Sequence, residues 1–153
     1  MSAIDDAGAS LFEQVGGERL RAVIEDFYQR VFTDPMIGFL FAGKDRARLV
    51  DKEWELAARM LGGPVTYTGR TMPAAHARVP ITGGHFDRRT RLLEQAMDAH
   101  AVPPAARAAW LAHTAAMRAQ ITADRGSDCD HDAAAARTTV DASPSAPLRL
   151  GRR

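Results

Sequence analysis

The stretch MPAAHARVPITGGHF, residues 72–86, decides how we interpret the fold of this chain. Thr71 can cap a helix that begins at Met72, because its side-chain oxygen can accept a free backbone N–H. Met72 lies one helical turn before His76, so both side chains share one apolar face. Pro80 is expected to end this helix. The segment therefore presents a histidine on a short apolar helix.

A histidine placed in this way has two interpretations. It can ligate a metal ion or a cofactor iron through one ring nitrogen. It can also be an ordinary core residue whose ring is bonded to a backbone carbonyl, which is the more common case. The rest of the chain decides between them.

Length and composition restrict the class of protein. The chain has 153 residues, 46% of them hydrophobic, which suits one modest domain with a core of its own. A formal net charge of +1 argues against a nucleic-acid partner. The single cysteine, Cys129, fits a reducing compartment, and the acidic start has no secretory signal. With no apolar run long enough for a membrane span, a cytoplasmic protein is expected.

Apolar residues recur at helical spacing through most of the chain, and no segment has a convincing strand pattern. The chain is therefore predicted to be all-α. Glycine and proline residues separate the expected helices, which cover residues 10–15, 18–33, 45–61, 72–79, 84–102 and 105–122.

Three regions follow from this pattern. Residues 1–9 are predicted to be a flexible N-terminus, and residues 10–123 a single helical domain. Residues 124–153 are rich in Ala, Asp, Ser, Thr, Pro and Arg and lack aromatic residues, so a disordered low-complexity tail is predicted. The tail sequence CDHD, residues 129–132, could bind a metal weakly, but we interpret it as ordinary tail.

Two polar side chains fall inside apolar helix faces. The hydroxyl of Tyr28 requires a buried partner or a ligand, although many buried tyrosines are purely structural. The carboxylate of Glu53 lies in the middle of the apolar arc of its helix. Burying a carboxylate there costs free energy unless it is paired, protonated or facing a polar pocket. Lys52 lies at the edge of that arc, where its stem can cover apolar surface while its charge stays in water.

Several well-known catalytic motifs are absent from the sequence. There is no GxxxxGK[ST] phosphate loop, no GxGxxG after a strand, no GxSxG elbow and no HExxH zinc motif. CxxC and CxxCH are also missing, so no covalent haem attachment is expected. Nucleotide-binding and hydrolase functions therefore have little support.

Taken in order, several short motifs resemble the truncated haemoglobins, most closely the first of their three groups. Their joint order and spacing are more specific than any one of them, and together they span roughly residues 11–122. The motifs are LFEQVGG (11–17), EDFY (25–28), FAG (41–43), LGGP (61–64), YTG (67–69), MPAAH (72–76) and ITGGHF (81–86).

The resemblance implies a two-over-two helical sandwich around a non-covalent b-type haem. It implies that His76 is the axial iron ligand and that Tyr28 donates a hydrogen bond to a bound gas. The other cofactor contacts that it implies are Phe41 against the porphyrin, Leu49 at the usual distal position, Lys52 near a propionate, and Met72, Ile81 and Phe86 on the proximal side.

The chain departs from the family pattern at Glu53, where group members often carry a ligand-binding glutamine. An ionised carboxylate would repel bound dioxygen, whereas a protonated one would donate a hydrogen bond as glutamine does. A third possibility is that Glu53 turns to a cation such as Lys52. Pro80 is a second departure, close to His76.

The expected ligands are dioxygen, nitric oxide and carbon monoxide. Two roles follow: a nitric oxide dioxygenase, or reversible oxygen storage, transport or gas sensing. The enzyme would need an external reductase as electron donor, because the chain has no flavin or nicotinamide motif. The alternatives are a helical interaction domain without haem and a non-haem metal site at His76, His85 and Glu53.

Overall fold

The computed structural model describes residues 8–123, and within them it contains helices and no strand. The all-α prediction is confirmed. Predictions for residues 1–7 and for the tail at 124–153 lie outside the described residues. The elements are α1 (Leu11–Val15), α2 (Gly17–Thr33), the 3-10 helix η1 (Gly38–Phe41), α3 (Arg46–Met60), α4 (Met72–His76), α5 (Gly83–Ala99), α6 (Pro104–Ala116) and α7 (Arg118–Ile121).

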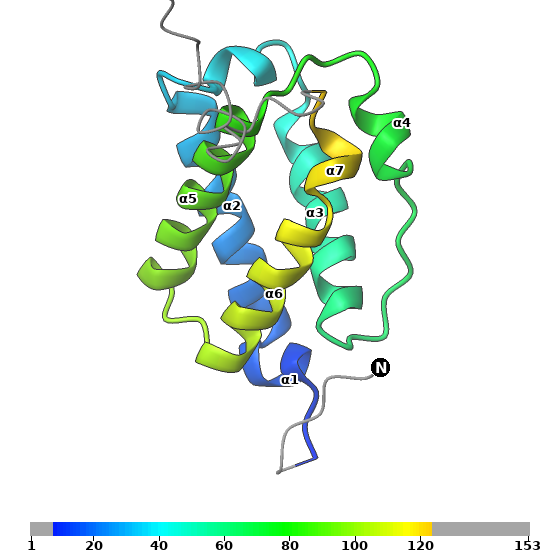
Figure 1. Ribbon diagram of the computed structural model, residues 1–153. Helices are drawn as coiled ribbons and strands as arrows, with labels where there is room; N and C mark the ends of the chain where they lie inside the picture. Colours follow the sequence, from blue (N-terminus) through cyan, green and yellow to red (C-terminus); the bar gives the residue numbers. More distant parts are fainter. Residues whose placement is uncertain (1–7, 124–153) are drawn as a thin grey trace, which may run out of the picture.

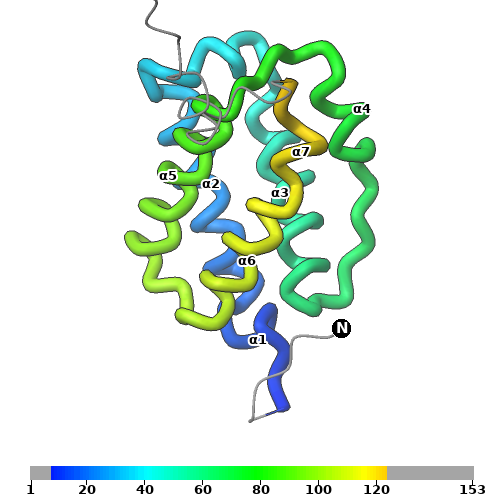
Figure 2. Tube along the Cα trace, in the orientation of Figure 1, coloured from blue at the N-terminus to red at the C-terminus, as the bar shows by residue number. Residues whose placement is uncertain are grey.

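Four longer helices form two packed pairs. Helix α2 packs against α3 and α5, and α6 packs against α5 and α3. In Figure 1 the α5–α6 pair lies in front of the α2–α3 pair, and the tube in Figure 2 shows the same two layers. Short helices complete the structure, with α1 against α6 and α4 against α7. This is a two-over-two helical sandwich. Among the helices of residues 8–123, none is long and apolar enough to cross a membrane.

Side-chain caps fix where α1, α4 and α5 begin. Ser10 accepts the backbone N–H of Glu13, and the Glu13 carboxylate accepts the N–H of Ser10 at 2.8 Å, which forms a capping box. Thr71 caps α4, as predicted. Thr82 and His85 form a similar reciprocal pair at the start of α5. These caps set the directions in which the helices leave their loops.

The core lies mainly between α2, α3, α5 and α6. Helix α2 buries one stripe of residues that recur at the helical period. Trp110 of α6 is almost fully buried and is the largest side chain of the core. The buried residues of α2 are Leu20, Val23, Ile24, Phe27, Tyr28 and Val31.

The glycine pair Gly62 and Gly63, directly after α3, lets α1 approach the end of that helix. The N–H of Phe12 donates to the carbonyl of Leu61 at 2.8 Å. A Cβ on Gly63 would lie 2.8 Å from Phe12 Cγ and 2.9 Å from the Ala58 carbonyl oxygen. A side chain at this position would therefore push the two elements apart.

Two predicted helix ends and one predicted continuous helix were wrong. Helix α4 ends at His76, before Pro80, because the N–H of Val79 turns back to the His76 carbonyl. Helix α5 ends at Ala99 rather than near residue 102. The predicted helix 105–122 is divided at Met117, whose N–H bonds to Thr114 in a tighter turn. This break lets α7 turn onto α4.

Candidate cofactor site

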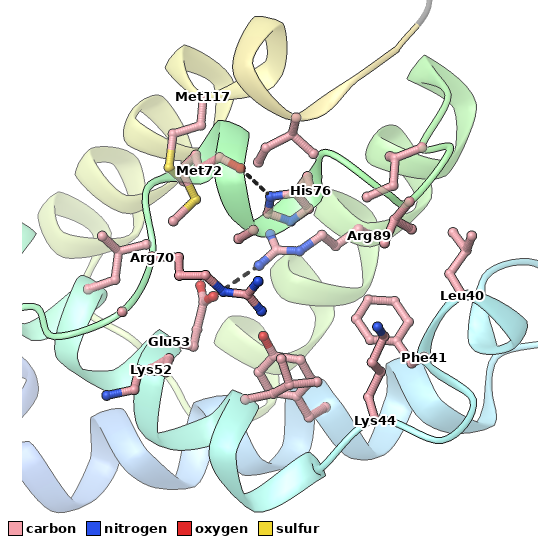
Figure 3. A pocket seen from close by; sticks show the side chains of 18 of the residues that line it. Leu40, Phe41, Lys44, Lys52, Glu53, Arg70, Met72, His76, Arg89 and Met117 are labelled. Atoms are coloured by element: carbon pink, nitrogen blue, oxygen red, sulfur yellow. Dashed lines mark hydrogen bonds and ion pairs between the residues drawn. The ribbon is translucent and has the colours of Figure 1, made fainter.

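One cavity gathers residues from distant parts of the chain. It lies between α3, α4, α5, α7 and the η1 segment, and Figure 3 shows many of the side chains that surround it. All of the site residues predicted from the sequence line it: Tyr28, Phe41, Leu49, Lys52, Glu53, Met72, His76, Ile81 and Phe86.

The apolar stripe of α3 is wider than packing in the core requires, because part of it borders the cavity. Val50 and Ala57 are buried against the other helices, whereas Leu49, Glu53 and Leu56 are only partly buried and line the cavity. The helix therefore packs on one side and borders the cavity on the other. This arrangement accounts for a carboxylate in the middle of an apolar arc.

His76 is oriented by the helix that carries it. Its Nδ1 lies 2.8 Å from the carbonyl oxygen of Met72, so Nδ1–H donates and Nε2 keeps its lone pair. Burial, with a further contribution from Arg89, lowers the pKa of the imidazole against the opposing effect of the Met72 hydrogen bond. The ring is therefore neutral near pH 7. Nε2 has no hydrogen-bond partner within residues 8–123, and this is the form that binds a metal.

Aromatic rings form the wall at the η1 end of the cavity. The ring centre of Phe41 lies 6.4 Å from that of Tyr28 and 5.7 Å from that of Phe32. Tyr28 is also 4.9 Å from Phe27, ring centre to ring centre. These contacts fix the position of the Tyr28 hydroxyl, which borders the cavity.

The Tyr28 side chain is only 5% exposed. Burial raises the pKa of its hydroxyl, and the negative charge of Glu53 raises it further, although Arg89 opposes both. The hydroxyl therefore keeps its proton throughout the physiological range. Tyr28 is a hydrogen-bond donor at the cavity wall.

Glu53 meets Arg89, a residue that the sequence analysis missed. Arg89 Nη2 lies 3.2 Å from Glu53 Oε2, and both side chains are largely buried. Of the three possibilities for Glu53, pairing with a cation is the one found, but the cation is not Lys52. Arg89 lies three residues after Phe86 and four before Leu93, on one helix face, and this spacing could have revealed it.

Lys52 is held by neighbours that were also missed. Its ammonium contacts the carboxylate of Glu55 at 3.1 Å and the hydroxyl of Thr68. Glu55 accepts the backbone N–H of Thr68 at 2.8 Å, which is the main reason that the pKa of this carboxyl is lowered. The group ties the loop before α4 to helix α3.

Further cations stand around the cavity. Lys44, Arg48 and Arg70 all belong to its lining, and Figure 3 shows Arg70 and Lys44 on different sides of it. Their charges suit a ligand with carboxylates at its edge. Arg70 belongs to a loop, so no helical pattern could predict its place in the lining.

The alternative of a non-haem metal site at His76, His85 and Glu53 finds no support among the described residues. No three His, Cys, Asp or Glu side chains between residues 8 and 123 gather closely enough to hold a metal. His85 lines the cavity, but its Nδ1 accepts the N–H of Thr82 at 3.2 Å as a helix cap. His76 and His85 thus have separate roles.

The cavity fits a haem by the chemistry of its residues. One neutral histidine offers a free Nε2. Aliphatic and aromatic side chains make up much of the lining, which suits a flat apolar ring, and the cations suit its two carboxylates. A two-over-two sandwich with one such histidine defines the class of truncated globins.

Comparison with known proteins agrees with this class. The family model for bacterial-like globins matches residues 10–123. The chain belongs to this family, as a truncated haemoglobin of group I. Haem-based binding of gases follows from that membership.

The relatives support the assignment from sequence and from structure. A group 1 truncated hemoglobin of Mycolicibacterium paratuberculosis is 40% identical over 96 residues, 62% of this chain and 71% of that protein. A group 1 truncated hemoglobin from a Nostoc species is 29% identical over 90 residues, which are 58% of this chain and 76% of that protein. The structure of the Tetrahymena pyriformis truncated hemoglobin matches the fold with a TM-score of 0.67 at 24% identity, over 74% of this chain and 98% of that one.

Proposed function

We propose that this chain holds a non-covalent b-type haem through His76 and binds dioxygen there, with nitric oxide and carbon monoxide as further ligands. The observation that carries the proposal is the bond from His76 Nδ1 to the Met72 carbonyl. This bond fixes the tautomer of the imidazole and leaves the lone pair on Nε2. Its acceptor, Met72, lies on the same short helix as His76.

Haem, when bound, supplies an iron with an open coordination position for a diatomic gas. Tyr28 then acts as a hydrogen-bond donor to a gas in the cavity, since burial keeps its hydroxyl protonated. A neutral hydrogen bond of this kind contributes about 0.5–1.5 kcal/mol. Tyr28 is thus proposed to slow the departure of dioxygen.

The remaining predicted contacts have supporting roles in this proposal. Phe41 packs against the ring, and Lys52 approaches a propionate while it stays near Glu55. Arg70 is a second candidate for a propionate. The apolar side chains proposed to enclose the ring are Leu49, Met72, Ile81 and Phe86.

We also propose that residues 10–123 form the complete haem-binding domain. The helices from Leu11 to Ile121, with the loops that join them, provide all of the cavity residues described above. On this proposal, residues 124–153 make no contribution to haem affinity.

The test is the absorption spectrum of protein reconstituted with haem, reduced, and exposed to carbon monoxide. We expect a stoichiometric Soret band that shifts with carbon monoxide and that weakens or changes in His76→Ala. His85→Ala is the matched control, because His85 is the other histidine of the cavity lining. A colourless wild type, or a band lost only in His85→Ala, would overturn the proposal.

Nitric oxide dioxygenation is the reaction that the same site would catalyse if the protein is an enzyme. Dioxygen, nitric oxide and one electron give nitrate, so sustained turnover needs an external reductase. Rapid mixing of the oxygenated protein with nitric oxide separates the two roles. Stoichiometric nitrate indicates the enzyme, and slow conversion indicates a reversible binder.

A further inference from the structure

Arg89 brings a positive charge to the edge of the proposed gas site. Its side chain is 18% exposed, and its guanidinium carbon lies 4.8 Å from the centre of the Phe27 ring. In Figure 3 the guanidinium extends into the region between His76 and Glu53. A charge in such a position changes which ligands the cavity favours.

The contact between Arg89 and Glu53 uses a single guanidinium nitrogen. Arg89 uses one nitrogen, Nη2, at 3.2 Å. The adjacent Arg88 binds Asp34 with two nitrogens, at 3.0 and 2.7 Å. Glu53 therefore occupies only one of the donor positions of Arg89. Some N–H donors of Arg89 therefore have no carboxylate partner among the residues described.

Tyr28 adds a second donor to the same place. Its hydroxyl interacts with both Glu53 and Arg89, and burial keeps it protonated. All three side chains line one cavity, although they come from α2, α3 and α5. A cation and a hydroxyl thus converge there, with one carboxylate as their shared acceptor.

We propose that Arg89 and Tyr28 form a binding site for a small monovalent anion, such as azide, fluoride or nitrite, and that Glu53 is the internal competitor for that site. The inference rests on the proposed function, since the anion shares the cavity with haem. An incoming anion takes the position of the carboxylate as acceptor from Arg89.

The charges explain why Glu53 controls the affinity. With Glu53 in place, the pair is neutral overall, and an anion must displace a carboxylate that is already close. Replacing Glu53 by glutamine leaves the same shape and a net positive charge. Anion affinity is therefore expected to rise in Glu53→Gln and to fall when Arg89 is removed.

The experiment titrates haem-loaded ferric protein with azide and fluoride, followed by absorption. Carbon monoxide binding to the reduced protein is the neutral probe. The variants are Glu53→Gln, Arg89→Lys and the double variant Arg89→Leu/Glu53→Gln, which avoids leaving Glu53 buried and unpaired. Arg91→Leu is the control, because Arg91 lies on α5 with 63% of its side chain exposed.

We expect azide to bind about tenfold more tightly to Glu53→Gln than to the wild type, and about 10- to 100-fold more weakly to the double variant than to Glu53→Gln. Arg89→Lys should keep part of the azide affinity, because lysine retains the positive charge. Carbon monoxide affinity should change little in all of the variants. The Soret band before titration reports separately whether haem is held as proposed.

Two outcomes would overturn the anion site while leaving haem binding intact. One is an equal change in azide and carbon monoxide affinity, which would show a change in cavity shape alone. The other is a loss of azide affinity in Arg70→Leu as large as in the double variant. That result would assign the preference to the general positive potential of the cavity rim.

Discussion

The carboxylate of Asp34, directly after α2, lies 2.7 Å from the guanidinium of Arg88 on α5. The same carboxylate accepts the backbone N–H groups of Met36 and Ile37, and its side chain is only 3% exposed. Asp34 thus ends one helix, shapes the turn toward η1, and joins α2 to α5.

The pH dependence of stability should reflect this contact. The hydrogen bond from Arg88, helped by the two backbone N–H groups, lowers the pKa of Asp34 below its usual value. Its contribution is therefore present above the unfolded-state pKa of about 4 and is lost as the pH falls through the lower folded-state pKa.

Asp34→Asn should lower the free energy of unfolding at pH 7 by about 1–3 kcal/mol. The difference from wild type should shrink in urea titrations carried below about pH 4. Asp98→Asn is the control, since Asp98 is 63% exposed in its pair with Arg107. An unchanged difference down to pH 2 would contradict the role of the Asp34 charge.

Tyr28→Phe removes the proposed donor and keeps the ring. The dissociation rate of dioxygen should rise about two- to tenfold, as for a lost neutral hydrogen bond. Stopped-flow displacement of dioxygen by carbon monoxide measures it. Tyr67→Phe is the matched control, because Tyr67 also lines the cavity but donates to the carbonyl of Arg70. Equal effects in both variants would remove the special role of Tyr28.

Long helices and their buried faces could be predicted from the sequence because apolar spacing follows the helical period. The buried stripe of α2 follows this period from Leu20 to Val31, within the helix predicted at residues 18–33. The break at Met117 was not predictable in this way, since apolar residues continue in register through Ile121. The break depends on packing against α4, which is distant in sequence.

The cavity residues were predictable from motifs, but the polar partners inside it were not. Glu53 was identified as unusual from its helix alone. Its partner Arg89 lies 36 residues away, and only the folded chain brings the two together. Glu55 accepts the N–H of Thr68, which belongs to a loop that has no periodic pattern.

Gly63→Ala should destabilise the domain by about 1–3 kcal/mol, since the new methyl group would overlap Phe12 and the Ala58 carbonyl. Gly84→Ala is the control. A Cβ there meets only Thr82 Oγ1, at 3.8 Å, so this variant should be neutral or up to about 1 kcal/mol more stable. Urea unfolding of both variants provides the comparison, and equal effects would contradict the close approach at Gly63.

Glu55→Gln should speed the loss of haem by about fivefold, equivalent to about 1 kcal/mol. The carboxylate holds both Lys52 and Thr68, and so anchors the loop that leads to His76. Transfer of haem to an excess of apomyoglobin measures the rate. Glu94→Gln should have no effect, because Glu94 pairs with the exposed Arg91 outside the cavity.

Two truncations test the extent of the domain. Ending the chain after residue 123 should leave the Soret band and haem affinity unchanged. Ending it after residue 116 removes α7, which packs on α4, and removes the bond from Ala123 N–H to the Ile81 carbonyl at 2.9 Å. That shorter chain should bind haem weakly. Normal affinity would show that α4 is held without α7.

The break at Met117 has a consequence for the order of events during synthesis. Helix α4 has only five residues, too few to persist alone in water, and its neighbour α7 is the last helix of the domain to be translated. We therefore expect His76 to become fixed only after residue 121 has been translated. Binding of a cofactor to a nascent chain is accordingly expected late in synthesis.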